Sequence, residues 1–510
     1  NGAPLSYWSG VAGVNPMRYK GGLVGGVWVN SFLSDLGNGI FDGANLVYNF
    51  ETLNPANTLW TKQYNVFSQV DTEEQRYLAF ERWWGGFFML TTEEIHYIVR
   101  NLFVGNKLEK GRLELHEGQR ISLKNIRSPI IVFASMGDNI TPAQQALNWI
   151  PRVYSSVEDI KRNGQVIVYI VHEEIGHLGI FVAGSIAKKE HKQIIANFDM
   201  IEFLQPGLYE MVIKGDVKSD DFEAEFVPRT FDDIAAYDDG TEDEIDFSVV
   251  NKVSETNDNI YQLFARPWVK FWTTELSAEI LRYLHPLRLQ RYAFADINPL
   301  MRPVKNIASI VRQNRHPAAS DNPFTAMEKD FPSYMDGVLD IYRDWRDLNH
   351  EAMFQMLYQS GLLRLFFPPE LPEEHKDTSE EDRADYDRRL QVLEEGGHAA
   401  GLIRIYMAIA KATGFFKQKH FEIANEISRT HKVLRKLRRA EFKKIMHDQT
   451  AILQADEDKA LNALSVLIKD HDDRLEALSI ARRLALADGI YSEEEKTLLE
   501  KIKAGLGLNK

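Results

Sequence analysis

Two short and almost wholly apolar runs constrain the fold of this 510-residue chain more than any other feature. The runs are residues 129–135 and 165–171, which are rich in valine and isoleucine and are followed by polar residues and glycine. Continuous apolar runs of this length are typical of strands buried on both faces of a parallel sheet. Between them, Thr141-Pro142-Ala143-Gln144 predicts the start of a helix that Asn163-Gly164 would end. The pattern therefore predicts a strand–helix–strand unit of an α/β fold with a right-handed crossover.

Asp138 and His177 follow the first and the second of these predicted strands. Polar side chains at the carboxyl ends of neighbouring parallel strands meet at one edge of the sheet, where such folds carry their functional groups. An acid followed by a histidine is also the chain order of the α/β-hydrolase triad, in which the acid orients the histidine and the histidine moves the proton. Two alternatives stay open: Asp138 caps the next helix and His177 is a structural loop histidine, or His172 is the base.

The triad also needs a nucleophile, and the chain contains no Gly-x-Ser-x-Gly or Gly-x-Cys-x-Gly motif. Ser135 lies inside a predicted strand and Ser185 follows the histidine, so neither suits the turn between a strand and a helix. Since the first residues look like the middle of a domain, we expect the nucleophile to precede residue 1. The 510 residues alone would then be catalytically incomplete.

Charge and composition exclude several classes of protein. The net charge of −14 argues against a nucleic-acid partner, and the absence of cysteine excludes disulfides and cysteine-ligated zinc. No apolar stretch is long enough to predict a membrane-spanning helix, and no signal peptide is evident, which fits a cytoplasmic protein. Residues 216–246 hold 13 acidic and two basic residues, which predicts a solvated linker or, alternatively, an acidic docking surface.

The remaining pattern predicts four regions. Residues 1–210 would be the C-terminal part of an α/β-hydrolase domain, 211–254 an acidic linker or insertion, 255–370 a helical region and 385–510 a helical domain. The fold class is thus α/β, a partial α/β-hydrolase fold followed by an all-α C-terminal half. The aromatic cluster at residues 81–88 is typical of a core, with the wall of a substrate site as the alternative.

Several long motifs resemble the bacterial DUF3141 family, which is similar to the polyhydroxyalkanoate synthases of the α/β-hydrolase superfamily. The motifs are residues 3–8, 15–19, 53–60, 102–108, 133–142 and 176–181. The resemblance as a whole covers at least residues 1 to about 360. It implies that Asp138 is the triad acid, that His177 is the general base and that a cysteine in an elbow before Asn1 is the nucleophile. The implied reaction moves a 3-hydroxyacyl group from coenzyme A to a growing polyester. True synthases lack a long helical C-terminal half, so polymer synthesis itself is in doubt.

The last part of the chain, from about residue 430, resembles TerB-like tellurite-resistance domains through Ala487-Asp488-Gly489 and residues 492–495. That resemblance implies metal contacts at Asp488 and Glu495. The residues alone also fit a simpler role, in which Asp488 ends one helix and Ser492 and Glu495 form the capping box of the next.

Three functions follow as expectations. The first is an acyltransferase acting on a CoA thioester, the second is a serine esterase or lipase-like hydrolase that differs only in its nucleophile, and the third is a non-catalytic scaffold or stress-response protein. The expected partners are an acyl thioester or ester substrate and, for the chain itself, a homo-oligomer. No cofactor and no metal site are predicted.

Overall fold

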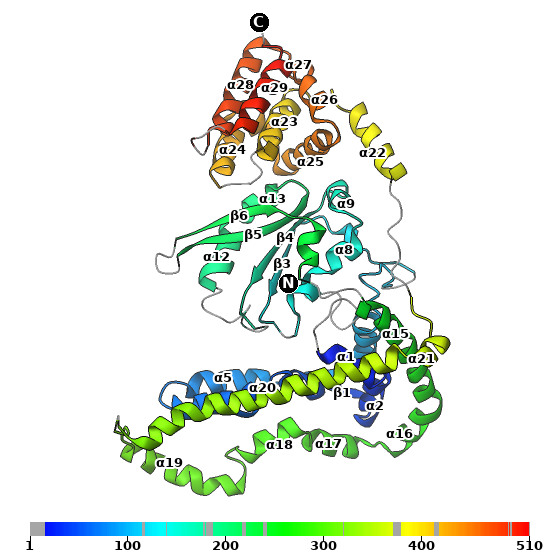
Figure 1. The fold of residues 1–510 in the computed structure, drawn as a ribbon, viewed down its shortest axis with the longest axis vertical. Coiled ribbons are helices and arrows are strands. Elements are labelled where there is room, and N and C mark those ends of the chain that lie inside the picture. Colours follow the sequence, from blue (N-terminus) through cyan, green and yellow to red (C-terminus); the bar gives the residue numbers. More distant parts are fainter. Residues whose placement is uncertain are drawn as a thin grey trace. The chain divides into compact units, whose positions relative to one another are not determined.

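The computed structural model describes the chain with several gaps (Figure 1). The described residues are 16–114, 118–138, 140–176, 179, 187–216, 221–237, 242–319, 321–370, 379–412, 418–487, 489 and 492–508. They form two compact units, each built from two separate stretches of chain. A sheet-containing unit comprises the described parts of 109–238 and 373–510, and a mainly helical unit comprises those of 6–108 and 239–372. These units cut across the expected boundaries, because each joins segments that are far apart in sequence.

The first unit contains a mixed four-stranded sheet in the order β3-β4-β5-β6. Strands β3 (Ile130–Ser135) and β4 (Val166–His172) are parallel neighbours, with Ser135 opposite His172. β4 is parallel to β5 (Gly207–Asp216), which pairs antiparallel with β6 (Asp221–Pro228). The mixed α/β class and the two predicted strands are therefore confirmed.

Three short helices, rather than one, connect β3 to β4. They are α7 (Ala143–Leu147), α8 (Trp149–Val153) and α9 (Val157–Arg162). The predicted helix start is wrong in detail: the N-cap of α7 is Pro142, and the Thr141 hydroxyl donates to Asp138 instead of capping the helix. The predicted stop is confirmed, because α9 ends at Asn163 and Gly164 takes a positive φ of 69°.

The acidic segment differs from the expected solvated linker. It forms the second half of the β5–β6 hairpin, helix α14 (Phe231–Ala235) and the start of α15 (Glu242–Ile260). Ala224 and Phe226 of β6 alternate with glutamates and are buried against the core of the sheet. One face of the hairpin is therefore apolar despite the high charge of the segment.

The C-terminal half is a compact helical module, as predicted. Its helices are α22 (Ser379–Gln391), α23 (Gly397–Ala412), α24 (Gln418–Thr430), α25 (Arg439–Ala455), α26 (Glu457–Asn462), α27 (Leu464–Leu467), α28 (His471–Ala485) and α29 (Glu493–Gly505). Helix α23 lies at the centre, and ten of the eleven residues from Ala400 to Ala410 are buried. A helix that is apolar on nearly all sides is expected where other helices surround it.

The mainly helical unit is held together by pairs of segments more than 200 residues apart. Its first stretch comprises α1 (Pro16–Leu23), α2 (Trp28–Leu36), β1 (Ile40–Asp42), α3 (Ala44–Leu53), α4 (Lys62–Ser68), α5 (Glu74–Trp84), β2 (Met89–Thr91) and α6 (Thr92–Ile98). Its second comprises α15, α16 (Arg266–Trp272), α17 (Glu275–Tyr283), α18 (Pro286–Ala293), α19 (Arg302–Asn314), α20 (Pro323–Tyr358) and α21 (Gly361–Phe366).

Two buried carboxylates connect these stretches. Asp35 of α2 accepts the Tyr261 hydroxyl at 2.9 Å and the Arg266 guanidinium at 3.0 Å. Asp258 of α15 accepts the Ser31 hydroxyl at 2.9 Å and lies 3.0 Å from His96. Burial raises the pKa of Asp258, but the hydrogen bonds with His96 and Ser31 outweigh it and hold the pKa below its usual value.

The aromatic cluster of residues 81–88 does not form a core, so that prediction is wrong. Trp83 is 60% and Phe88 is 85% exposed, and α5 contains no buried residue. Large apolar side chains remain exposed throughout this unit.

Candidate catalytic edge of the sheet

The loops that follow β3 and β4 lie against each other at the carboxyl edge of the sheet. The amide of Met136 donates to the carbonyl oxygen of His172 at 2.8 Å. Gly137 approaches the second loop so closely that a Cβ atom there would lie 2.2 Å from the carbonyl oxygen of Glu174. Asp138 is therefore placed directly beside the loop that begins at His172, as the spacing of the two strands predicts.

Asp138 is 2% exposed, and its carboxylate is fixed by its own loop. Oδ1 accepts the backbone N–H groups of Ile140 and Thr141, both at 2.9 Å, and Oδ2 accepts the Thr141 hydroxyl at 2.8 Å. These bonds close the turn before α7 but do not cap the helix itself, whose N-cap makes no side-chain hydrogen bond.

His177, the predicted base, lies outside the described residues, as does Ser185. Its rival His172 ends β4, and its Nδ1 accepts the backbone N–H groups of Glu174 at 3.1 Å and Ile175 at 3.2 Å. The proton of a neutral His172 ring is therefore assigned to Nε2, which lies 4.0 Å from the carboxylate of Glu190. The Nδ1 atom of His172 is thus occupied within its own loop, so it is poorly placed to accept a proton from a nucleophile.

Ser135 is fully buried at the end of β3 and is also committed to the loops. Its hydroxyl donates to the carbonyl oxygen of Ile175 at 2.6 Å and accepts the amide of Gly137 at 3.2 Å. Ser135 therefore connects the two loops by hydrogen bonds and is not placed as a nucleophile. This agrees with the prediction from its position inside a strand.

Glu190 is the residue near this edge that the sequence pattern does not reveal. Its side chain is only 4% exposed, and its Oε2 has no hydrogen-bond partner among the described residues. Within the charged run of residues 188–192 nothing distinguishes it from a surface glutamate. Only the fold brings it to the end of β4.

The family model for "Protein of unknown function (DUF3141)" matches residues 1–399. The chain belongs to the DUF3141 family. Among curated proteins, an "Uncharacterized protein in ackA 5'region" of Rhizobium meliloti is 41% identical, over all of this chain and 72% of its own length. No solved structure shows a significant match. The family match covers β3, β4 and both loops of the candidate edge, and it ends at the start of α23.

The second group of predicted residues lies in the C-terminal helical module. The capping box is confirmed: the amide of Ser492 donates to the Glu495 carboxylate at 2.7 Å, and the amide of Glu495 donates to the Ser492 hydroxyl at 3.1 Å. Asp488 lies outside the described residues. Over the part of the chain that is described, no group of three or more His, Asp or Glu side chains is arranged to hold a metal ion, and no helix is long and apolar enough to cross a membrane.

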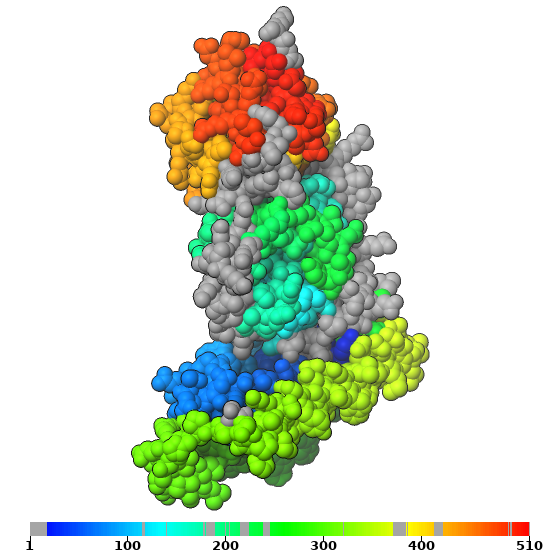
Figure 2. Space-filling model, turned by 60° about the vertical axis from the view of Figure 1, so that its left-hand side comes forward, coloured from blue at the N-terminus to red at the C-terminus, as the bar shows by residue number. Residues whose placement is uncertain are grey.

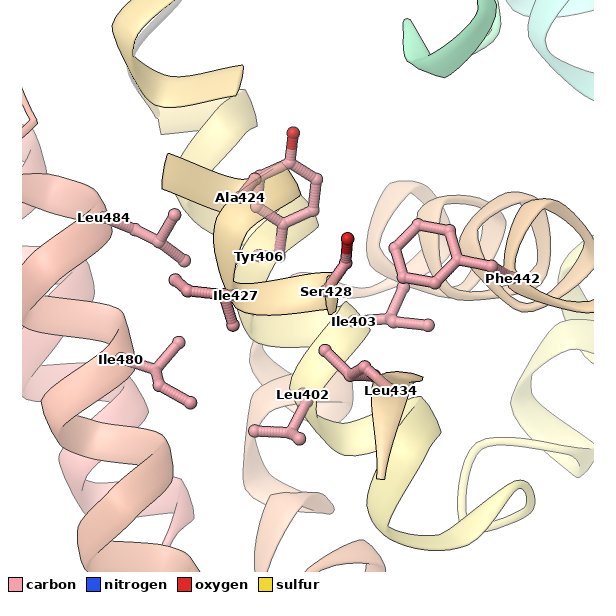
Figure 3. Close-up of a pocket in the computed structure, with 10 residues that line it drawn as sticks. All are labelled: Leu402, Ile403, Tyr406, Ala424, Ile427, Ser428, Leu434, Phe442, Ile480 and Leu484. Atoms are coloured by element: carbon pink, nitrogen blue, oxygen red, sulfur yellow. The ribbon is translucent and has the colours of Figure 1, made fainter. Parts of the chain in front are cut away.

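An apolar pocket in this module, shown in Figure 3, offers no catalytic chemistry. Its walls come from α23, α24, α25, α28 and the short 3₁₀ helix Leu434–Lys436, and the two hydroxyl groups among the lining side chains belong to Tyr406 and Ser428. The Ser428 hydroxyl donates to the carbonyl oxygen of Asn425 at 2.8 Å, so it is occupied within its own helix. The pocket therefore resembles a packing gap between helices.

His447 of α25 makes the stability of this unit dependent on pH. Burial lowers its pKa, and the charge of Lys443 lowers it further. The unfolded chain therefore binds the proton more readily, so stability is lost as pH falls through the unfolded value of about 6.5. We expect the drop in thermal stability between pH 7.5 and pH 5.5 to be smaller in His447→Gln than in the wild type. The exposed His471→Gln is the control, and an equal drop in all three proteins would contradict the assignment.

Proposed function

We propose that this chain provides the acid and the base of an α/β-hydrolase-type acyltransferase similar to polyhydroxyalkanoate synthases. The observation that carries the proposal is the buried carboxylate of Asp138, which follows β3 directly after Gly137. Gly137 in turn lies against the loop that follows the adjacent parallel strand. His177 lies a few residues further along that second loop in sequence. The proposal places the nucleophile in sequence that precedes residue 1.

The proposed reaction has two steps. His177 takes the proton of the nucleophile, which attacks the carbonyl carbon of a 3-hydroxyacyl-CoA thioester, and coenzyme A leaves as the thiol with that proton. A hydroxyl group of the acceptor then attacks the acyl-enzyme and forms an ester, while the bond between the acyl group and the nucleophile breaks. The hydroxyl proton passes through His177 to the released nucleophile. Asp138 orients the imidazole ring and stabilises its positive charge.

Two alternatives are a serine esterase and a non-catalytic scaffold. A serine esterase would use the same edge, since Asp138 and His177 serve either nucleophile, and water would then attack the acyl-enzyme. A non-catalytic scaffold is favoured by the local bonds of Asp138, because three donors within residues 140–141 already give its carboxylate a structural role. Only activity measurements separate these functions.

The test uses the intact protein with 3-hydroxybutyryl-CoA as the probe, and release of coenzyme A as the readout. We expect Asp138→Asn and His177→Ala each to lower kcat by roughly 10³–10⁴-fold, as for loss of a triad member. His172→Ala, a histidine of the same loop, serves as the matched control and should stay within about tenfold of wild type. Circular dichroism verifies that the variants remain folded.

Each contrary result selects another function. If His177→Ala is fully active and His172→Ala is not, the base is wrongly assigned. If the wild type hydrolyses 4-nitrophenyl butyrate but does not turn over the thioester, the esterase is favoured. If neither probe reacts with the wild type, the acyltransferase proposal fails and the scaffold remains.

A further inference from the structure

Helix α20 is 36 residues long and carries a heptad repeat of apolar residues from Phe324 to Leu348. One set recurs every seven residues: Phe324, Phe331, Val338 and Trp345. A second set follows each of these by three residues: Met327, Tyr334, Ile341 and Leu348. Alternating steps of three and four over four heptads are the signature of a helix that packs along its length against another helix. We call these eight residues the α20 seam.

The described residues leave most of the α20 seam uncovered, although the ring of Phe331 contacts that of Trp60. Its eight side chains are between 43% and 77% exposed, and Figure 2 shows the yellow-green helix as an uncovered strip on one face of the unit. With about 200 Å² for each large side chain, the exposed area of the seam is roughly 900 Å². A monomer rarely exposes more than about 600 Å² of contiguous apolar surface, whereas a stable dimer buries about 800 Å² on each partner.

A second apolar surface lies on the preceding helices α16 to α19, which we call the arm (residues 266–315). Figure 1 shows the arm as an arc of helices separate from α20. Trp268, Phe271, Leu300 and Ile310 of the arm are each at least 60% exposed. The arm and α20 are thus two unpaired apolar surfaces of one unit.

Opposite charge makes the arm and α20 complementary. The arm contains nine Lys or Arg and three Asp or Glu residues, a net charge of +6. Residues 323–358 of α20 contain seven acidic and three basic residues, a net charge of −4. Asp330 and Asp344 directly precede seam residues, so two α20 seams packed on each other would bring like charges together. A basic apolar surface is therefore the better partner for the seam.

The arm of the same chain is anchored elsewhere. Arg288 of α18 forms a bidentate ion pair with the buried Asp42 of β1, in which Nη2 donates to Oδ1 at 2.9 Å. Nη2 of Arg291 lies 3.2 Å from Oε2 of Glu81 in α5. Leu287, which directly precedes Arg288, is buried. These contacts fix α18 beside the first stretch of the unit, so the arm leaves its own seam uncovered.

We propose that a second copy of the chain covers the seam, and that the arm of each copy packs on the α20 of the other. Because both contacts are made twice around a two-fold axis, the assembly closes as a dimer. The acidic flanks of α20 argue against the competing idea of an anionic membrane surface as the partner.

The first test is sedimentation of the full chain at micromolar concentration. We expect a dimer for the wild type and a monomer for Ile341→Glu, since the charge would lie at the centre of the buried seam. Ile195→Glu provides the matched control, because Ile195 is 75% exposed on α12 (Lys192–Ala196) in the other unit, and should stay dimeric. A monomeric wild type overturns the proposal, and so does a monomer that binds vesicles of anionic phospholipid.

A charge-reversal test separates arm-on-seam packing from seam-on-seam packing. We expect Asp330→Lys with Asp344→Lys to weaken the dimer at least tenfold, and Arg302→Glu with Lys305→Glu in the arm to do the same. Combining all four changes should restore wild-type affinity, because the attraction is rebuilt with opposite signs. If reversal on α20 strengthens the dimer and reversal on the arm has no effect, the helices α20 pair with each other and the proposed arrangement is wrong.

Discussion

Arg404→Met is expected to destabilise the C-terminal helical module by roughly 3–5 kcal/mol, because each of several buried acceptors left without a donor costs about 1–3 kcal/mol. Arg404 is fully buried at the centre of α23. Its guanidinium donates to the Gln449 side chain at 2.7 Å and to the carbonyl oxygens of Ala460 at 2.8 Å and Leu393 at 2.7 Å. Burial lowers its pKa to about 10, so it remains charged at neutral pH. Methionine preserves much of the packing volume but leaves three buried acceptors without a donor.

Denaturation with urea, followed by circular dichroism, measures this loss as a lower midpoint. The control is Arg435→Met, which changes an exposed arginine of the same module and should alter stability by less than about 0.5 kcal/mol. Equal midpoints for the two variants would show that Arg404 does not hold the module together.

Gly137→Ala should separate the two loops of the candidate edge and lower the proposed acyl transfer by about 10²-fold, the effect of displacing a catalytic group by roughly 1 Å. The added Cβ would lie 2.2 Å from the carbonyl oxygen of Glu174 and 2.4 Å from its carbonyl carbon. Backbone atoms cannot rotate away as a flexible side chain can, so the loop that carries Asp138 must move. We expect a stability loss of about 1–3 kcal/mol as well.

The second loop offers a matched control in Gly176. A Cβ at Gly176 would meet no atom of the described residues within 4 Å, and its backbone does not require glycine. Gly176→Ala should therefore keep both the activity and the melting temperature of the wild type. If Gly137→Ala behaves in the same way, the contact between the loops has no role in positioning Asp138.

Local patterns predict the parts of this fold that depend on local interactions. The runs before Asp138 and His172 become β3 and β4 because nearly every residue in them is apolar, and the capping box of Ser492 and Glu495 forms as written in the sequence. The position of Asp138 at the carboxyl edge follows from the same two strands. Glu190 could not be found in this way, since its burial depends on how a charged helix folds over the sheet.

Patterns fail where distant segments decide the structure. The hydroxyl of Tyr358 donates to the carbonyl oxygen of Gly22, which is 336 residues away in sequence. No periodicity in the sequence predicts such a pair. Residues 81–88 show the opposite failure, because aromatic content predicts a core and the fold leaves Trp83 and Phe88 exposed. The alternation of Phe222, Ala224 and Phe226 did contain a strand signal, which the high charge of the acidic segment obscured.

The interleaved units also set an order of events during synthesis. The first stretch of the helical unit ends near residue 108, but its partner Tyr358 is translated about 250 residues later. At 5–20 residues per second, this stretch waits roughly 10–50 s for the part of its cover that α20 supplies. The sheet is made within that interval. We therefore expect chaperones to bind the newly made helices of this first stretch while the chain is still attached to the ribosome.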